Sequence, residues 1–374
     1  MNPTTPALAG LLILAVQGDP EWNTFHGGPS LDGVAAGTIP DSPVRLWEFK
    51  TGAPVEAPPV YGGGRFYAVT AGSGLFALDT EGRPVWTFRI EGDSFLSPAL
   101  YADGTIFAGT EKGLLVALDG GNGQERWRAK VGDTVMGTPN RIDLPGGRHA
   151  IAAMSQNDGV LRAFDPGTGR ALWAAEGVGR CDAHPSASGG RIVVGSCAAA
   201  LHLFEAAGEV RRRDIPLAED GQVAGGAALA GGIAYVGTHG GKVFAVDLEA
   251  GKILWRNRSA GGETFTTPAV SDRLVVFGSK DGKVYAVDRA KGDPVWEHDT
   301  GGEPSSPVVV GERVTVSSKG TLLVLELATG KKVWSAPVSD AISGPAVARG
   351  LLVVGTDQGT VVAWGAAPRE RRGR

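Results

Sequence analysis

Residues 286–296 read Ala286-Val287-Asp288-Arg289-Ala290-Lys291-Gly292-Asp293-Pro294-Val295-Trp296, one copy of the pattern A-x-D-x-x-x-G-x-x-x-W. The pattern returns without gaps at 117–127, 163–173 and 245–255, and one residue shorter at 77–86. Degenerate copies lie at 324–334, with Glu326 for the aspartate, and at 203–212, with Glu205 for the aspartate and Arg212 for the tryptophan. Copies about 40 residues apart are typical of a repeat architecture.

Each copy belongs to a larger unit of four short predicted strands. In the unit around residues 266–296, a run of small residues with a proline is followed by a β-branched run at 274–278, then by 283–288, and last by the strand that carries Trp296. Turn residues separate these runs, so each unit predicts a small antiparallel meander. A single meander cannot bury both faces, whereas copies arranged radially can, and this arrangement is a β-propeller.

The tryptophan position counts the blades. It recurs at Trp47, Trp86, Trp127, Trp173, Arg212, Trp255, Trp296 and Trp334. The last unit ends after three strands at Trp364, while residues 44–49 form a strand with no unit before it. The sequence therefore predicts an all-β, eight-bladed propeller of four-stranded antiparallel blades over residues 44–365, closed by an N-terminal strand that completes the last blade. Closure removes exposed sheet edges.

The tryptophans of these repeats are expected to lie on the outer strands and to lean on the neighbouring blade. The docking set is Trp47, Trp86, Trp127, Trp173, Trp255, Trp296 and Trp334. Truncating a buried tryptophan costs about 3–5 kcal/mol, so a ring of them would fix the spacing of the blades.

Composition excludes several classes of protein. The 58 glycines show no three-residue period, so the chain is not collagen-like. A formal net charge of −4 gives no basic footprint for nucleic acid. No apolar run reaches the 18 or so residues that span a bilayer.

The ends of the chain differ from the repeats. Residues 7–16 form an apolar run of signal-peptide length, so residues 1–18 are interpreted as a signal peptide and the protein as periplasmic or secreted. No Lys or Arg precedes this run, which leaves a mis-assigned start or a fraying tail as the alternative. Residues 19–43 are a lead-in whose aromatic part, 22–29, is expected to plug one end of the fold. The basic tail, 366–374, is expected to be disordered.

The repeats resemble the tryptophan-docking repeats of the PQQ-like (pyrroloquinoline-quinone) propeller family. Residues 22–29 resemble the W-x-x-F-x-G-x-P lead-in of such proteins. The resemblance covers about residues 21–365 and implies the fold. It does not imply one function, because the family includes quinone-dependent alcohol and glucose dehydrogenases as well as BamB-type scaffolds of outer-membrane assembly.

Two cysteines, Cys181 and Cys197, fall on the first and second strands of the fourth unit, close to opposite positions. A structural disulfide is the preferred interpretation for an exported chain. Two free buried thiols, or a metal or redox role, are the alternatives. PQQ dehydrogenases typically carry a disulfide between adjacent cysteines beneath the cofactor, and the absence of an adjacent pair here argues against that activity.

The six histidines show neither HxxxH nor HxH spacing, and no zinc, nucleophile-elbow or phosphate-loop motif occurs. We therefore predict no catalytic, cofactor-binding or metal-binding residue. His184 could face the channel, His202 is interpreted as an ordinary strand residue, and His26 alone is a poor candidate for a site.

A carboxylate precedes the first strand of every unit, which suggests an acidic binding rim around one mouth of the channel. The set is Glu56, Asp93, Asp133, Asp182, Asp220, Glu263, Glu303 and Asp340. The alternative is that these residues serve turns and solubility. A second, chemically varied set falls in the turns between second and third strands, where specificity often lies: Lys112, Asn157, Asp158, His239, Lys280, Asp281, Lys319, Asp357 and Gln358.

Three functions follow. The preferred one is a non-catalytic, monomeric binding or scaffold propeller outside the cytoplasm, with protein partners of the envelope or cell surface and no cofactor. The alternative is a quinoprotein dehydrogenase acting on alcohols or sugars, with PQQ and calcium. A cytosolic WD-type propeller ranks last because the repeats lack the GH…WD pairing.

Overall fold

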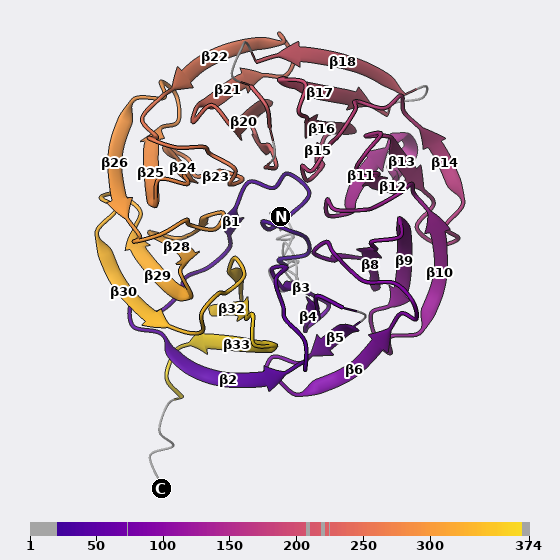
Figure 1. The fold of residues 1–374 in the computed structure, drawn as a ribbon, viewed down its shortest axis with the longest axis horizontal. Helices are drawn as coiled ribbons and strands as arrows, with labels where there is room; N and C mark the ends of the chain where they lie inside the picture. Colours follow the sequence, from indigo (N-terminus) through magenta and orange to yellow (C-terminus); the bar gives the residue numbers. More distant parts are fainter. Residues whose placement is uncertain (1–20, 73, 207–209, 218–220, 224, 369–374) are drawn as a thin grey trace, which may run out of the picture.

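The computed structural model describes residues 21–72, 74–206, 210–217, 221–223 and 225–368. Within these residues the chain forms 33 strands and one 3-10 turn, η1 (Pro145–Gly147). The strands make eight sheets around a central axis (Figure 1), and each sheet is one blade of a propeller. The predicted fold class and blade number are confirmed. None of the described residues lies in a helix long and apolar enough to cross a membrane.

The first two strands of each blade lie nearest the axis. Glycine, alanine, serine and valine make up most of the first strands, which suits their crowding at the centre. The first strands are β3 (Val60–Gly62), β7 (Leu100–Ala102), β11 (Asn140–Leu144), β15 (Ser186–Ser188), β19 (Ala228–Ala230), β23 (Ala269–Val270), β27 (Val308–Val310) and β31 (Ala346–Ala348). The second strands are β4 (Arg65–Val69), β8 (Thr105–Gly109), β12 (Arg148–Met154), β16 (Arg191–Gly195), β20 (Ile233–Gly237), β24 (Leu274–Gly278), β28 (Arg313–Ser318) and β32 (Leu351–Gly355).

The third strands are buried on both faces, and the outer strands are half exposed. The third strands are β5 (Gly74–Leu78), β9 (Leu114–Asp119), β13 (Leu161–Phe164), β17 (Ala200–Glu205), β21 (Val243–Asp247), β25 (Lys283–Asp288), β29 (Thr321–Glu326) and β33 (Thr360–Gly365). The outer strands are β6 (Pro84–Arg89), β10 (Glu125–Lys130), β14 (Ala171–Ala174), β18 (Arg211–Pro216), β22 (Lys252–Asn257), β26 (Pro294–Asp299), β30 (Lys332–Pro337) and β2 (Val44–Lys50).

The ring is closed by the strand from the front of the chain. β2 pairs antiparallel with β33, with Val44 opposite Gly365 and Trp47 opposite Ala363. The last blade therefore has the strand order β2-β33-β32-β31, and its outer strand precedes its inner ones in the sequence (Figure 1). This is the closure that the sequence predicts.

The geometry of the turns explains the repeated motif. In the blade of residues 269–299, Asp288 Oδ1 accepts hydrogen bonds from the backbone N–H groups of Ala290 and Lys291, which shapes the turn between the third and outer strands. The motif glycine lies under the tryptophan of the preceding blade, because a Cβ on Gly292 would meet the Trp255 ring at 2.6 Å. The Trp255 indole N–H donates to the Arg289 carbonyl at 2.9 Å.

Four other indoles make the same contact with the carbonyl that follows the motif's acidic residue. The pairs are Trp47 with Thr80 at 2.9 Å, Trp86 with Gly120 at 3.0 Å, Trp127 with Pro166 at 2.9 Å and Trp296 with Leu327 at 2.8 Å. The indoles of Trp173 and Trp334 have no hydrogen-bond partner among the described residues. How much these contacts contribute to stability stays a prediction.

The fourth blade departs from the predicted alignment. Arg213, not Arg212, occupies the tryptophan position, because Leu203 pairs with Arg213 where the other blades pair Ala or Val with Trp. The other outer ladders have a register shift beside the tryptophan, whereas this ladder is continuous. Arg213 donates to the Leu248 carbonyl, the equivalent acceptor in the next blade, and to the Glu249 carbonyl at 3.0 Å.

Residues 22–35 line the inside of the ring, and we call this segment the inner hoop. Backbone N–H groups of successive first strands donate to its carbonyls: Tyr61 to Trp22, Tyr101 to Asn23, Ala187 to Pro29, Leu229 to Ser30, Val270 to Asp32 and Val309 to Gly33, at 2.7–2.8 Å. The third blade contributes the Asn140 side-chain amide, which donates to the Pro29 carbonyl at 2.8 Å. Strand β1 (Val34–Ala35) ends the hoop by pairing parallel with β27. The chain thus contacts seven first strands in order before it leaves to form β2 (Figure 1).

The hoop fills one end of the channel, as the sequence predicts for residues 22–29. Trp22 is 1% exposed, and His26 is 3% exposed with its ring nitrogens 2.8 Å from the Leu31 carbonyl and 2.7 Å from the Pro307 carbonyl. Burial lowers the pKa of His26. One mouth of the channel is therefore occupied by the protein's own chain.

Candidate functional site

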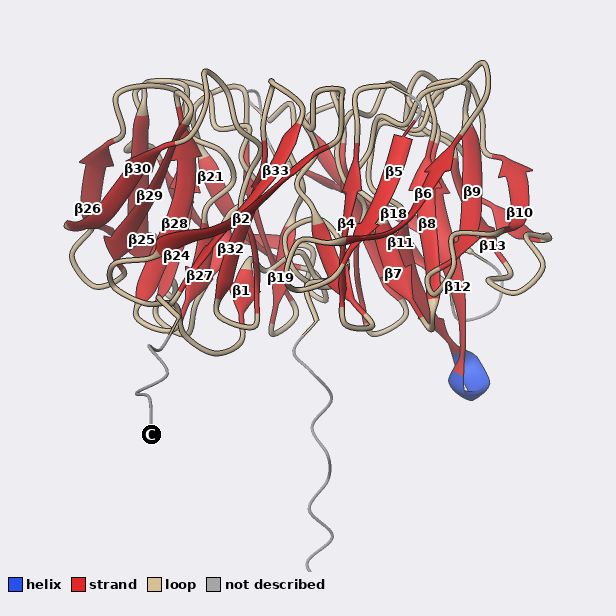
Figure 2. Ribbon diagram, turned by 90° about the horizontal axis from the view of Figure 1, so that it is seen from below, coloured by secondary structure: helices blue, strands red, loops and turns tan. Residues whose placement is uncertain are grey.

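The two faces of the ring differ (Figure 2). The plug face carries the inner hoop, the turns between first and second strands and those between third and outer strands; η1 projects from it. The open face carries the turns between second and third strands and the connections from each outer strand to the next blade. The described members of both sets of residues that the sequence nominates for binding lie on the open face.

Four of the rim carboxylates are engaged by neighbouring side chains or turns. Asp93 Oδ1 accepts from the Lys112 backbone N–H at 3.0 Å, and Asp133 Oδ1 accepts from Thr134 N–H at 2.7 Å. Asp182 accepts from the Gln156 amide at 2.6 Å. Glu263 pairs with Lys280 at 2.8 Å, and the hydrogen bond from Lys280 lowers the pKa of Glu263. These four serve the structure of the connections, as the alternative interpretation expects.

Three other rim carboxylates are free of such partners. Glu56, Glu303 and Asp340 are exposed, and their side chains make no hydrogen bond or ion pair with any residue that the structure describes. Asp220 lies outside the described residues. The open face thus has two kinds of carboxylate. Some stabilise turns, and others are available to a partner.

The varied turn residues form one local cluster on the open face. The Lys280 ammonium lies 4.1 Å from the centre of the Phe265 ring, and the His239 ring meets Phe265 edge-on at 4.2 Å. His239 Nδ1 lies 3.5 Å from Glu263. In the neighbouring turn, Asp281 accepts from the Tyr285 hydroxyl at 2.6 Å, and burial raises the pKa of Tyr285.

The other turn residues do not gather at one point. Asp158 accepts a hydrogen bond from Ser155, and Asp357 accepts one from Ser339 at 2.5 Å. Lys112, Asn157, Lys319 and Gln358 lie on turns of four different blades.

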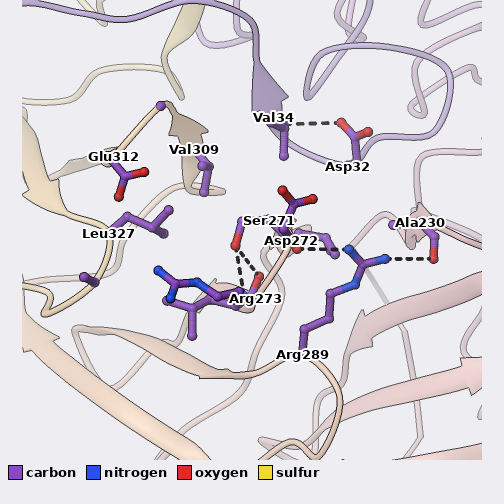
Figure 3. A pocket seen from close by; sticks show the side chains of 14 residues that line it. Asp32, Val34, Ala230, Ser271, Asp272, Arg273, Arg289, Val309, Glu312 and Leu327 are labelled. Carbon is purple, nitrogen blue, oxygen red and sulfur yellow. Dashed lines mark hydrogen bonds between the residues drawn. The ribbon is translucent and has the colours of Figure 1, made fainter.

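The plug face has a hollow of about 440 Å³ between the blades of β23 and β27 (Figure 3). Val34, Val309 and Leu327 supply apolar walls, with Asp32, Asp272 and Glu312 around them. The Arg289 guanidinium is held at the edge of the hollow by backbone carbonyls. It donates to the Ser271 carbonyl at 3.1 Å and to the Ala230 carbonyl at 3.4 Å. The charged residues that line the hollow are Asp32, Asp272, Arg273, Arg289 and Glu312.

The candidate disulfide between Cys181 and Cys197 is not formed. Both thiols are free; Cys181 is buried and Cys197 is exposed. The backbone N–H of Cys181 is held by the Gln156 carbonyl of the preceding blade, and its Sγ lies 3.2 Å from the Gly195 carbonyl. Burial raises the pKa of Cys181 to about 12, so this thiol stays protonated at neutral pH.

The histidines offer no metal site. Nowhere in the described ranges do three or more His, Cys, Asp or Glu side chains gather where they could hold a metal ion. His184 does face the plugged end of the channel: its ring stacks on Phe25 at 3.9 Å, and burial lowers its pKa to about 4.

His202 is not an ordinary strand residue. Its Nε2 lies 2.7 Å from Ser196 Oγ and its Nδ1 lies 2.8 Å from Asp214 Oδ1, a serine–histidine–aspartate relay in the blade that lacks the tryptophan. Ser196 is 0% exposed, so its hydroxyl lies away from solvent. Arg212 donates twice to Asp214 and lowers its pKa to about 2. No local sequence motif predicts the relay, because Ser196 lies just after β16, His202 on β17 and Asp214 on β18.

A closed eight-bladed propeller, plugged at one end and lined on the other face by varied turns, defines the class of protein: a β-propeller with the repeats of the PQQ-like type. The particular family is shown by its profile, described as outer membrane protein assembly factor BamB, which matches residues 41–143 and 157–371. The chain belongs to this family.

The proteins similar to this chain include assembly factors and a quinone-dependent dehydrogenase. Outer membrane protein assembly factor BamB of Yersinia pestis is 25% identical over 79% of this chain and 76% of its own length. The 1-butanol dehydrogenase (quinone) of Thauera butanivorans is 32% identical over 35% of this chain, and the match spans only 25% of that enzyme. The crystal structure of BamB from Moraxella catarrhalis has a TM-score of 0.69 and 18% identity, covering 89% of this chain and 99% of that one, which shows the shared fold.

Proposed function

We propose that this protein is a non-catalytic binding propeller of the cell envelope that acts in outer-membrane protein assembly. Its partner is a protein, and it docks on the open face through a segment that carries basic residues. The observation that carries the proposal is the asymmetry of the ring. One mouth is occupied by the inner hoop, while the other presents Glu56, Glu303 and Asp340 without partners among the described residues.

The match to the BamB family over most of the chain supports this role, and so does the relative of Yersinia pestis, which covers most of both sequences. Carboxylates around an open mouth attract a positively charged segment and speed its encounter. A periplasmic, monomeric protein without cofactor is part of the same proposal.

The second candidate function is a PQQ-dependent dehydrogenase, favoured by the similarity of one third of the chain to a quinone-dependent butanol dehydrogenase. The two functions separate in one assay. The full chain is titrated with PQQ in the presence of calcium, and absorbance and dye-linked oxidation of alcohols and sugars are followed. We expect neither saturable binding nor turnover, because no group of three or more His, Cys, Asp or Glu side chains that could hold a metal ion occurs among the described residues. Saturable binding with turnover would replace the scaffold by an enzyme.

A further inference from the structure

A groove on the outer margin between the blades of β26 and β30 differs in charge from the acidic connections of the open face. Its volume is about 520 Å³, and its basic side chains are His298, Lys319 and Lys332. Asp299 is the one carboxylate among the lining residues, and its Oδ1 already accepts from the Gly301 N–H at 2.7 Å. The lining therefore carries a net positive charge in a protein whose net charge is −4.

The two lysines are available to a ligand. Neither Lys319 nor Lys332 forms an ion pair with a carboxylate of the described residues, whereas Lys283 of the same region pairs with Glu297 at 2.7 Å. Both side chains are exposed at the groove. An ammonium without a carboxylate partner keeps its donors free for an anion.

Lys319 is held over the groove by its backbone. It has φ +43, a left-handed conformation that is uncommon for residues other than glycine and often occurs at functional positions. Its aliphatic stem lies against Gly302, where an added Cβ would come within 2.5 Å of the lysine Cγ. The glycine thus leaves room for the stem to cross from one blade to the connection before it.

Hydroxyl groups complete the groove. The Thr300 and Ser318 hydroxyls donate to the Gly302 carbonyl at 2.7 and 2.8 Å, so they can only accept from a ligand. The Thr321 and Ser335 hydroxyls have no hydrogen-bond partner among the described residues and can donate. Burial and the nearby Lys332 lower the pKa of His298, so a bound anion would favour the protonated ring.

We propose that this groove binds the phosphate group of a phosphorylated small molecule or lipid headgroup. Two unpaired ammonium groups, an imidazole and two hydroxyl donors suit a multiply charged oxyanion, which accepts several charge-assisted hydrogen bonds at once. The proposal does not depend on the partner that the open face binds.

The test is a titration of the full chain with inorganic phosphate at constant ionic strength, followed by the NMR signals of the histidine rings. We expect saturable shifts centred on His298 and a rise in its pKa when phosphate is bound. The Lys319→Gln/Lys332→Gln variant should bind about tenfold more weakly, the loss expected for two exposed charge pairs. Lys291→Gln/Lys331→Gln, which changes the net charge equally at plug-face turns, is the matched control and should bind as the parent does.

Equal weakening in both double variants, or no saturable shift at His298, would overturn the proposal. Gly302→Ala adds a second measure, because it displaces the Lys319 stem without removing a charge and should also weaken binding. Vesicles of phosphatidylcholine with and without phosphatidic acid then distinguish the sources. Capture that depends on phosphatidic acid and on Lys319 and Lys332 assigns a lipid headgroup, and phosphate binding without capture assigns a soluble ligand.

Discussion

Replacing Trp255 with alanine is expected to lower the free energy of unfolding by about 3–5 kcal/mol. The indole is 8% exposed, lies over Gly292 of the next blade and donates to the Arg289 carbonyl at 2.9 Å. The truncation removes this packing, opens a cavity between two blades and leaves a turn carbonyl without its donor. The measurement is a urea or guanidinium unfolding curve of the variant and the parent.

Trp334→Ala is the matched control for this substitution. Trp334 holds the same position in its blade, opposite Val324, but its indole has no hydrogen-bond partner among the described residues. We expect a clearly smaller loss for Trp334→Ala. Equal losses at the two positions, or a loss below about 1 kcal/mol at Trp255, would mean that the indole contact does not hold the blades together.

Gly33→Ala is expected to destabilise the inner hoop by about 2–4 kcal/mol, combining overpacking with a strained backbone. Gly33 has φ +68, and a Cβ there would lie 2.3 Å from the His26 ring and 2.9 Å from the Ala269 side chain. The hoop cannot move aside easily, because the Gly33 carbonyl accepts from the Val309 N–H at 2.8 Å. Unfolding curves give the size of the effect.

Hydrogen exchange shows where the Gly33→Ala effect acts. Leu229, Val270 and Val309 donate their N–H groups to the hoop, so these amides should lose protection in the variant. Gly37→Ala is the control: its φ is +90, but a Cβ there meets no atom within 4 Å, so only backbone strain of about 1 kcal/mol is expected. Unchanged protection of the three amides in Gly33→Ala would contradict the hoop's role in capping the first strands.

The fold could be predicted because the same sequence pattern, with the same contacts between blades, occurs several times in the chain. Each role requires one residue type at a fixed position of the repeat. Asp288 shapes the turn, Gly292 leaves room for an indole, and Trp255 of the preceding blade supplies that indole. The closing strand could be predicted by counting strands at the two ends. Periodicity carries this information without any knowledge of contacts.

The features that sequence reasoning missed depend on register and on single, unrepeated contacts. Arg213 takes the place of the tryptophan because the pairing of β17 with β18 has no register shift. No residue of that blade predicts this difference in register. The path of the inner hoop is set by backbone carbonyls, which carry no side-chain signature. Cys181 and Cys197 are close enough in a simple hairpin to suggest a disulfide, but both thiols are free, and the Cys181 N–H donates to the Gln156 carbonyl of the preceding blade.

The candidate site was foreseen only in part. The sequence places eight carboxylates on one face, and the structure separates those that hold turns from those that are free. Glu263 illustrates the first kind through its pair with Lys280 at 2.8 Å, and Glu303 the second. The partners of these carboxylates are lysines and turn amides of the neighbouring blade. The distance from a carboxylate to such a donor cannot be predicted from their spacing along the chain.

Recovery of a protein partner from envelope extract by the tagged full chain tests most directly whether the open face is the binding surface. The triple variant Glu56→Lys/Glu303→Lys/Asp340→Lys reverses three exposed open-face carboxylates that hold no turn together, so it should fold and recover at least about tenfold less partner. Asp272→Lys/Asp293→Lys/Glu312→Lys makes the same change in net charge on the plug face and should recover as much as the parent. Undiminished recovery by the open-face variant, or loss confined to the plug-face variant, would contradict the assignment of the binding surface to the open face.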